Sequence, residues 1–263
     1  MESQESYSVS EFRILHLYHD LMNLYGDWAN ADVLARGLIA RGLGAAVEKK
    51  SVGDDVCFDA YDFIYIGSGT ERSQRACMRD MMRLRDELVG CIEAGMQVLA
   101  TGNAHELFGV AVTDARGERF DALGLLPFET VQRDSRVTGD SVFKASFLHE
   151  RLIGFINRAG GGQEGDIERP FIAEFGPAKD GSGAEGIRYK NLLGTYMTGP
   201  ILVRNPPLLK YIIDILVSAA TNADLRDAED SVPYVAGGDA FFRYQEEAYK
   251  LALKELLARR EER

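Results

Sequence analysis

The sequence predicts an α/β protein whose first half builds a mainly parallel central sheet and whose second half adds further strands. Two observations support this prediction. Between residues 11 and 109, short apolar runs alternate with segments of helical periodicity, as they do in parallel β–α units. After residue 109 the alternation stops, and shorter strand-like runs joined by turns replace it before two C-terminal helices.

The first elements follow in chain order. Residues 11–18 (EFRILHLY) predict the first strand. In residues 30–41 the apolar side chains fall on one helical face, and the glycines that follow end this helix. Residues 45–49 and 61–66 then predict the second and third strands. Residues 73–94 are expected to form a single long helix, whose methionines fill core space.

Residues 98–109 (VLATGNAHELFG) are the most informative stretch of the chain. A buried fourth strand at 98–100 runs into a sharp turn and the start of a helix. This layout is that of a nucleophile elbow, which holds one side chain at the end of a sheet for attack on a carbonyl. The tip of the turn is Gly102, which has no side chain to attack with, and Thr101 before it is expected to point back toward the sheet.

The second half predicts shorter elements and a tail. The expected strands are 128–131, 142–147, 152–156, 172–175 and a pair within 187–196. An apolar helix is expected at 208–220, after the start signal Asn205-Pro206-Pro207. We expect one domain over residues 11–220, followed by an acidic linker and a C-terminal helix in 221–263 that packs on it or extends from it.

Composition excludes several functions. The 263 residues include 30 basic and 41 acidic ones, so the formal charge of −11 argues against nucleic-acid binding and adsorption to anionic membranes. Cys57, Cys77 and Cys91 form no CxxC pair, so no metal site is expected, and their sparse number suits a reducing compartment. The polar N-terminus lacks a secretion signal, and no apolar run is long enough to cross a bilayer. We therefore expect a cytoplasmic protein without a cofactor.

Four motifs resemble those of a known family. They are LMNLYGDWAN at 21–30, IGSGTERSQ at 66–74, RVTGD at 136–140 and EGIRYKNLLGTYMTGP at 185–200. The first, second and fourth are similar to LNLYGDxGN, GGGxDREQ and EGxxYKNxxGTYLHGP of the cobyric-acid-synthase-like branch of class I glutamine amidotransferases. Within that branch they are most similar to the amidotransferase subunits of lipid II isoglutaminyl synthases. The resemblance covers about residues 12–217.

The resemblance implies a three-layer, flavodoxin-like fold and a known chemistry. Members of the family hydrolyse glutamine with a cysteine at the elbow and a histidine in the last motif, while backbone N–H groups hold the oxyanion. The ammonia goes to an ATP-dependent partner, which is a Mur-ligase-like subunit in lipid II amidation; cobyric acid synthesis is the other process that the branch serves.

Both catalytic side chains of the family are replaced in this chain. Aligning the elbow LxICGGYQxLG with residues 98–109 puts its cysteine on Gly102, and the histidine of TYLHGP falls on Thr198. In the FENHGGRT loop, the glutamate and histidine become Ile156 and Arg158. Two losses on separate segments, each inside a matching frame, make misalignment a poor explanation.

Other parts of the pocket are retained by the same comparison. Arg136 aligns with an arginine at the family's active site and is a candidate to grip a carboxylate. Gly67 and Gly69 are expected to form the loop that faced the oxyanion, and Asn103 to present the N–H beside the former nucleophile. Such a pocket would bind glutamine or a related amino acid without reacting with it.

Two hypotheses remain. The first is a non-catalytic homologue that acts as a binding or regulatory subunit of an ATP-dependent amide ligase. The second is an active glutaminase with a relocated nucleophile, for which Cys77 is the candidate because it lies nearer the strand ends than Cys91. His105 lies one turn into the elbow helix and is expected to be exposed or hydrogen-bonded; the other histidines, His16, His19 and His149, carry no motif. Because glycine relieves backbone strain at an elbow, Gly102→Cys is expected to lower the melting temperature.

Overall fold

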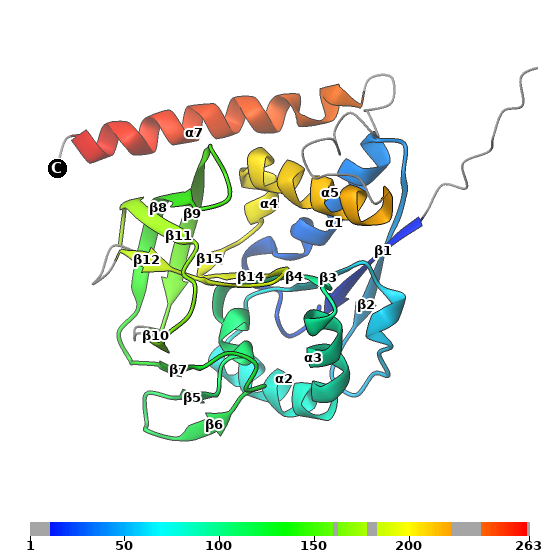
Figure 1. The fold of residues 1–263 in the computed structure, drawn as a ribbon. Helices are drawn as coiled ribbons and strands as arrows, with labels where there is room; N and C mark the ends of the chain where they lie inside the picture. The colour runs from blue at the N-terminus through cyan, green and yellow to red at the C-terminus, as the bar shows by residue number, and fades with distance from the viewer. Residues whose placement is uncertain (1–10, 160–162, 178–182, 222–237, 262–263) are drawn as a thin grey trace, which may run out of the picture.

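The computed structural model describes residues 11–159, 163–177, 183–221 and 238–261. In these ranges a central sheet has the order β13-β14-β4-β3-β1-β2 (Figure 1). Its strands are β1 (Glu11–Leu17), β2 (Gly44–Lys50), β3 (Phe63–Ile66), β4 (Gln97–Thr101), β13 (Ile187–Tyr189) and β14 (Leu192–Thr195). Neighbours from β2 to β14 are parallel, and β13 runs antiparallel to β14. The predicted α/β fold with a mainly parallel central sheet is confirmed.

Helices cover both faces of this sheet and make three layers (Figure 1). One face carries α1 (Trp28–Ala40), α4 (Ile201–Arg204) and α5 (Pro206–Thr221); the other carries α2 (Glu71–Arg83), α3 (Arg85–Glu93) and the 3₁₀ helix η3 (Gly102–Phe108). Side chains alternate along each strand, so Tyr65 packs in the first core while Ile64 and Ile66 pack in the second. Burial on both faces explains why β3 (FIYI) is a continuous apolar run in the sequence.

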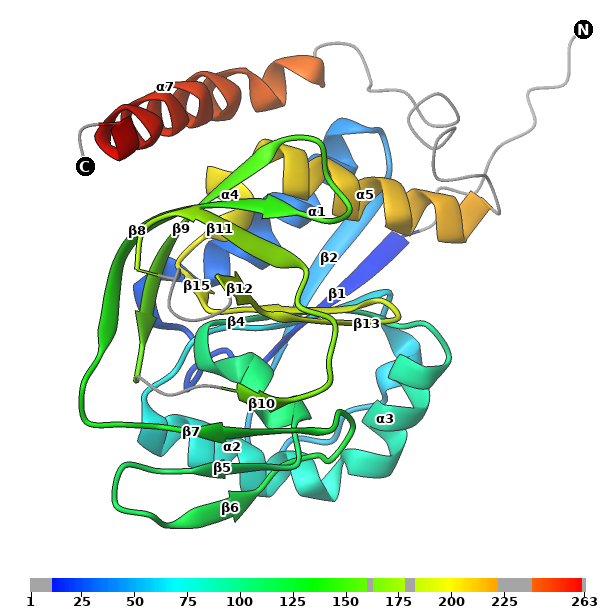
Figure 2. The same ribbon diagram turned by 60° about the vertical axis from the view of Figure 1, so that its left-hand side comes forward.

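The second half adds two smaller sheets (Figure 2). In the described residues one contains β8 (Val137–Ala145), β9 (Arg151–Arg158), β11 (Phe171–Phe175), β12 (Ala184–Glu185) and β15 (Met197–Thr198). The other contains β5 (Ala111–Thr113), β6 (Arg119–Asp121), β7 (Phe128–Val131) and β10 (Gln163–Gly165). The expected additional strands are present, although β8 begins earlier than the predicted segment 142–147.

The C-terminal helix α7 (Arg243–Glu261) lies across the β8–β9 hairpin (Figure 1). Its buried Tyr249 and Leu256 pack against Val142 and Ile153, and the Tyr249 hydroxyl donates to the Arg151 carbonyl. The helix therefore covers the face of this sheet that the main core leaves open. Of the expected linker 221–240, residues 222–237 lie outside the described ranges.

The prediction of a single long helix at 73–94 is wrong, because the structure has two helices there, α2 and α3. Leu84 has φ −97° and ψ 3°, outside the helical region, and separates α2 from α3. The charges around the break match two helix ends: Arg83 lies in the last turn of α2, and Asp86 and Glu87 lie in the first turn of α3. The helical periodicity of the sequence continues across Leu84, so these charges were the sequence feature that indicated the break.

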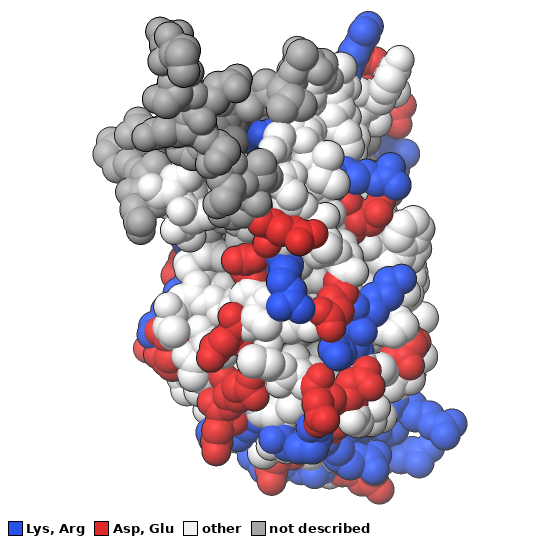
Figure 3. All heavy atoms as spheres, turned by 90° about the vertical axis from the view of Figure 1, so that its right-hand side faces the viewer, with Lys and Arg blue, Asp and Glu red and all other residues white. Residues whose placement is uncertain are grey.

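Charge is distributed rather than concentrated on the face that includes the β2 edge. Figure 3 shows acidic and basic side chains interleaved there, with basic groups densest along the lower edge. Within the described part of the chain, no helix combines the length and apolar character needed to cross a bilayer.

Candidate functional site

The turn after β4 has the backbone shape of an elbow. β4 ends at Thr101, whose buried hydroxyl lies 2.8 Å from the Tyr65 hydroxyl of β3, so this side chain is turned into the sheet. Gly102 follows with φ +60°, a left-handed conformation that residues other than glycine seldom adopt. The helix that begins there is closed by a 2.7 Å hydrogen bond between His105 Nδ1 and the Gly102 carbonyl.

Ser68 fills the space beside Gly102. A Cβ atom placed on Gly102 would lie 2.2 Å from Ser68 Oγ and 2.7 Å from Ser68 Cβ, much closer than non-bonded atoms approach. Ser68 is buried and stands at the middle glycine of the GGGxDREQ motif. Sequence reasoning did not single out this serine, although it departs from the motif. The substitution was the signal in the sequence that the glycine loop packs against Gly102.

Thr198 is held by the backbone of a neighbouring strand. It lies in β15, which pairs with β9, and its Oγ1 donates to the Phe155 carbonyl at 3.0 Å. The side chain is nearly fully buried. A hydroxyl held in this way carries no group with a pKa suited to take a proton from a nucleophile near neutral pH.

The candidate residues of the rim and loop take different positions. Arg136 donates to Glu71 Oε1 at 2.7 Å and to Asn157 Oδ1 at 2.7 Å, so its guanidinium is already engaged. Asn103 Oδ1 accepts from the Gly69 N–H at 3.0 Å, which ties the glycine loop to the elbow helix. Gly67 is required by close approach, because a Cβ there would lie 2.4 Å from the Met22 carbonyl oxygen.

The structure brings most of these candidates together around one small hollow. Ser68, Gly69, Asn103, Arg136 and Thr198 all line it, whereas Gly67 and Gly102 lie behind its wall. The space inside is about 10 Å³, which is enough for one water molecule. We call this space the inner hollow.

Glu106 closes the base of the inner hollow, and sequence reasoning missed it. Its carboxylate accepts hydrogen bonds from Gln74 Nε2 at 2.7 Å, Gln132 Nε2 at 3.0 Å and Tyr196 Oη at 2.9 Å. Burial raises the pKa of this carboxyl group. Glu106 stands where the elbow motif LxICGGYQxLG has glutamine, so the substitution was visible, but the donors that surround it were not.

Two buried polar side chains of the first motif, Asp27 and Asn30, form hydrogen bonds to the segments around the elbow. Asp27 Oδ2 accepts from the Ser68 N–H at 2.5 Å, and burial raises the pKa of Asp27 to about 6. Asn30 Nδ2 lies 2.7 Å from Tyr65 Oη and 3.2 Å from the Gly199 carbonyl oxygen, while its Oδ1 accepts from Leu202 N at 2.9 Å. These two side chains join the glycine loop, the central sheet and the last motif.

The last motif is also fastened by polar contacts. Glu185 accepts from Thr195 Oγ1 at 2.5 Å and from Tyr196 N at 2.8 Å, and burial raises its pKa to about 7. At the other end of the hairpin, Lys190 Nζ bonds the Glu93 carboxylate, and Asn191 Nδ2 donates to the Gly95 carbonyl. The YKN part of the motif therefore anchors β14 beside the start of β4.

The cysteines and histidines are placed as structural residues. Cys77 is fully buried in the core beneath α2, and its pKa is raised to about 12, first by burial and then by Asp20 and Asp80. Cys91 donates its S–H to Asp59 Oδ1 at 3.0 Å. His105 is buried as well as hydrogen-bonded, with its ring 4.2 Å from that of Tyr196. Among the described residues, no three His, Cys, Asp or Glu side chains gather as a metal site requires.

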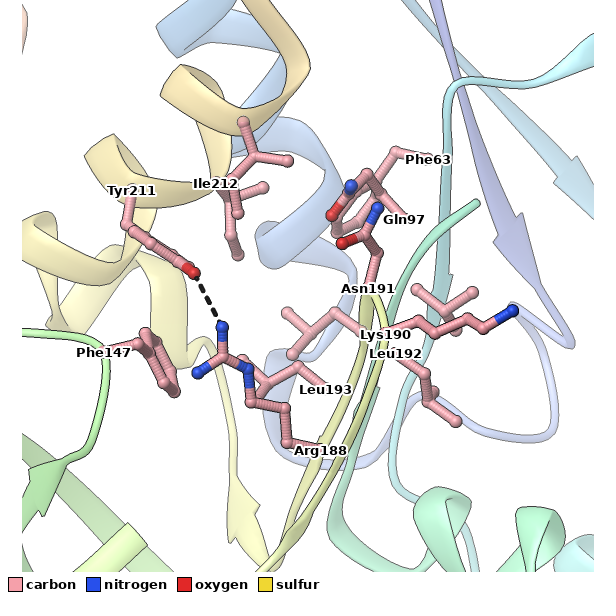
Figure 4. Close-up of a pocket in the computed structure, with 13 residues that line it drawn as sticks. Phe63, Gln97, Phe147, Arg188, Lys190, Asn191, Leu192, Leu193, Tyr211 and Ile212 are labelled. Carbon is pink, nitrogen blue, oxygen red and sulfur yellow. Dashed lines mark hydrogen bonds between the residues drawn. The ribbon is translucent and has the colours of Figure 1, made fainter. Parts of the chain in front are cut away.

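A separate hollow lies at the opposite end of β4 (Figure 4). It is lined by the amino-terminal residues of β3, β4 and β14 and by α5, and its volume is about 40 Å³. Arg188 occupies much of its mouth, where its guanidinium donates to Tyr211 Oη at 3.4 Å and lies 4.8 Å from the Phe147 ring centre (Figure 4). Ligand sites of parallel sheets lie at the carboxyl ends of the strands, so this hollow is not part of the elbow site.

The parallel sheet, the elbow at the carboxyl end of β4 and the glycine loop packed against it define the fold of the class I glutamine amidotransferases. Two solved structures share this fold. PurLQS from Thermotoga maritima matches with a TM-score of 0.54 and 13% identity, over 76% of this chain and 92% of that one. A crystal structure of a glutamine amidotransferase matches with a TM-score of 0.50 and 14% identity, over 77% and 98%.

Residues 13–206 match the CobB/CobQ-like glutamine amidotransferase domain, and the chain belongs to this family. Curated relatives include the lipid II isoglutaminyl synthase (glutamine-hydrolyzing) subunit GatD of Staphylococcus aureus strain N315, 31% identical over 205 residues, which are 78% of this chain and 84% of that protein. The subunit GatD of Streptococcus pneumoniae (strain ATCC BAA-255 / R6) is 30% identical over 225 residues, with 82% and 84% covered.

Proposed function

We propose that this chain is a catalytically silent amidotransferase homologue that serves as a binding or regulatory subunit of an ATP-dependent amide ligase. The names of its relatives place them in lipid II isoglutaminyl synthase, which favours peptidoglycan amidation over cobyric acid synthesis. The partner would be a Mur-ligase-like enzyme in the cytoplasm. In this proposal residues 11–220 form the amidotransferase-like domain, and residues 221–263 are an appended segment.

The contact between Ser68 and Gly102 is the observation on which this proposal rests. A nucleophile needs a side chain at the elbow and a base within hydrogen-bond reach. Here the elbow residue has no side chain, and the space that its Cβ atom would need is filled by Ser68. The residue in the base position, Thr198, is bonded to the Phe155 carbonyl. Restoring the cysteine alone would therefore produce a collision rather than an active site.

A second function deserves a direct test because of the same contact. The Ser68 hydroxyl lies where a cysteine side chain would begin, beside the buried carboxylate of Asp27. An active glutaminase with a relocated nucleophile would have to use Ser68 or the buried Cys77. The proposal predicts that neither residue reacts.

Glutamate release from glutamine by the purified full chain tests the proposal. We expect release at the background rate, both for the chain alone and after co-expression with the Mur-ligase-like protein of the same organism. Release above background that disappears in Ser68→Ala or Cys77→Ala would overturn the proposal and identify the nucleophile. An intact glutaminase in the same assay provides the positive control.

The partner is tested by co-purification from the native host. We expect a ligase of the Mur type to elute with the chain in a constant ratio. A chain that elutes alone, and that fails to bind the ligase when the two are mixed, would contradict the proposed partner while leaving the absence of catalysis intact.

A further inference from the structure

A larger hollow lies next to the inner one. It has a volume of about 260 Å³ and is lined by the start of α2, the turn after β5 and the segment between β7 and β8. Glu71, Gln132 and Arg136 line both hollows. The 2.7 Å ion pair between Arg136 and Glu71 thus stands in the wall between them. We call the larger space the outer hollow.

The side chains that line the outer hollow carry one more positive charge than negative charge. Within the described residues, four arginines, Arg75, Arg116, Arg133 and Arg136, stand against three acidic residues. This local excess of positive charge occurs in a chain whose formal charge is −11. Arg75 is paired with Asp114 and Arg136 with Glu71, whereas Arg116 and Arg133 form no ion pair with the described part of the chain.

The backbone that carries these two arginines is held in place. Asp114 Oδ1 accepts the N–H groups of Arg116 and Glu118, each at 2.9 Å, and so fixes the turn after β5. The Arg133 N–H donates to the Ala159 carbonyl at 3.1 Å, and Ala159 also lines the hollow. Arg116 and Arg133 are therefore presented from two separately anchored segments.

We propose that the outer hollow binds a small ligand with two anionic groups, through Arg116 and Arg133. A guanidinium group pairs with a carboxylate or phosphate through parallel hydrogen bonds, and two such groups select a ligand with two such anions. The inner hollow holds only one water, so the ligand lies outside the former reaction centre. This inference rests on the proposed function, since a working glutaminase would need its substrate in the inner hollow.

Calorimetric titration of the full chain tests this site. The probes are glutamate, which has two carboxylates, glutamine, which has one, and inorganic phosphate. We expect saturable binding of glutamate that weakens as salt is raised, with glutamine and inorganic phosphate each at least about tenfold weaker. Binding of glutamate would support the site and identify a dicarboxylate ligand, whereas binding of phosphate without glutamate would show a site for a single anion and would contradict the two-anion assignment.

Variants locate the bound ligand. The double variant Arg116→Ala/Arg133→Ala is expected to weaken binding at least about tenfold. Arg72→Ala, an exposed arginine at the start of the same α2 helix and outside the hollow, is expected to change it by less than about twofold. Melting curves confirm that the variants are folded.

Three results would overturn the inference: no saturable binding of glutamate, equal binding of glutamine and glutamate, or unchanged binding in the double variant. Measuring glutamate release in the same samples keeps the two proposals separate. Hydrolysis of glutamine would overturn the proposed function, whereas an absence of binding without hydrolysis would overturn only the ligand site.

Discussion

Two neighbouring regions of this molecule, both built from the family's motifs, have different contents. Beneath the elbow, Asp27, Asn30 and Glu185 are buried polar groups with hydrogen-bond partners in several motifs. At the elbow itself, Gly102 has no side chain and Ser68 fills the adjoining space. The first region positions the segments of the fold, and the second is where the family's reaction would take place. Retained motif residues are thus evidence for the architecture, whereas the proposed loss of the family's chemistry rests on Gly102 and Thr198.

The largest effect is expected for Asn30→Ala. The substitution leaves Leu202 N and the Gly199 carbonyl, both bonded to Asn30, buried without this partner, and each such loss costs about 1–3 kcal/mol. With the lost contact to Tyr65 Oη, we expect the free energy of unfolding to fall by about 5 kcal/mol, measured by urea denaturation. Asn23→Ala, which removes one exposed hydrogen bond that Asn23 Oδ1 accepts from Trp28 N, should cost about 1 kcal/mol. Equal losses of unfolding free energy in Asn30→Ala and Asn23→Ala would contradict the idea that the buried polar region positions the segments of the fold.

Gly102→Cys tests the other region. The cysteine would adopt the left-handed backbone at φ +60° and collide with Ser68, and these two effects together should cost about 4 kcal/mol. Combining it with Ser68→Gly removes the collision and leaves the backbone strain. In that background the cost of the cysteine should fall to about 1–2 kcal/mol. The same cost in both backgrounds would show that Ser68 does not fill the nucleophile's space.

The sequence predicts the first half of the fold better than the second for a physical reason. Central strands buried on both faces are largely apolar runs, which is why β3 and β4 could be predicted from the sequence. Strands such as β12 and β15 contain two residues each, which is too short for any periodicity to register. Their formation depends on neighbours supplied by distant segments of the chain.

The candidate site shows the same limit. Gly102 and Thr198 are predicted to occupy the family's catalytic positions because they interrupt long motifs. The contact between Ser68 and Gly102 joins residues from two different loops, and the donors around Glu106 come from three other segments. The sequence shows each of these substitutions separately. The structure shows that the side chains pack around a space that is large enough for one water molecule.

Glu185 links the retained region to pH. Its folded pKa of about 7 lies above the ordinary value of 4.5, so the stability gained from its neutral form is complete below pH 4.5 and is lost as pH rises through 7. Glu185→Gln stays neutral throughout. We expect wild type to lose about 3 kcal/mol relative to the variant between pH 4.5 and 8, measured by urea denaturation at each pH. If the difference in the free energy of unfolding between wild type and Glu185→Gln stays constant over this pH range, the effect of burial on Glu185 is refuted.

Thr198→Val has the smallest expected effect on the free energy of unfolding, and it tests directly whether the base position is still used. Valine keeps the shape of threonine but cannot donate to the Phe155 carbonyl, so the loss should be about 1 kcal/mol, and Thr198→Ser should lose less because it keeps the hydroxyl. Under the proposed function neither variant should alter glutamate release, because a catalytically silent centre has no step for the residue to assist. If Thr198→Val lowered a measurable rate of release while its stability stayed within that range, the base position would still be in use. That result would contradict the proposal that the elbow region is catalytically silent, while leaving the structural role of the buried polar residues unchanged.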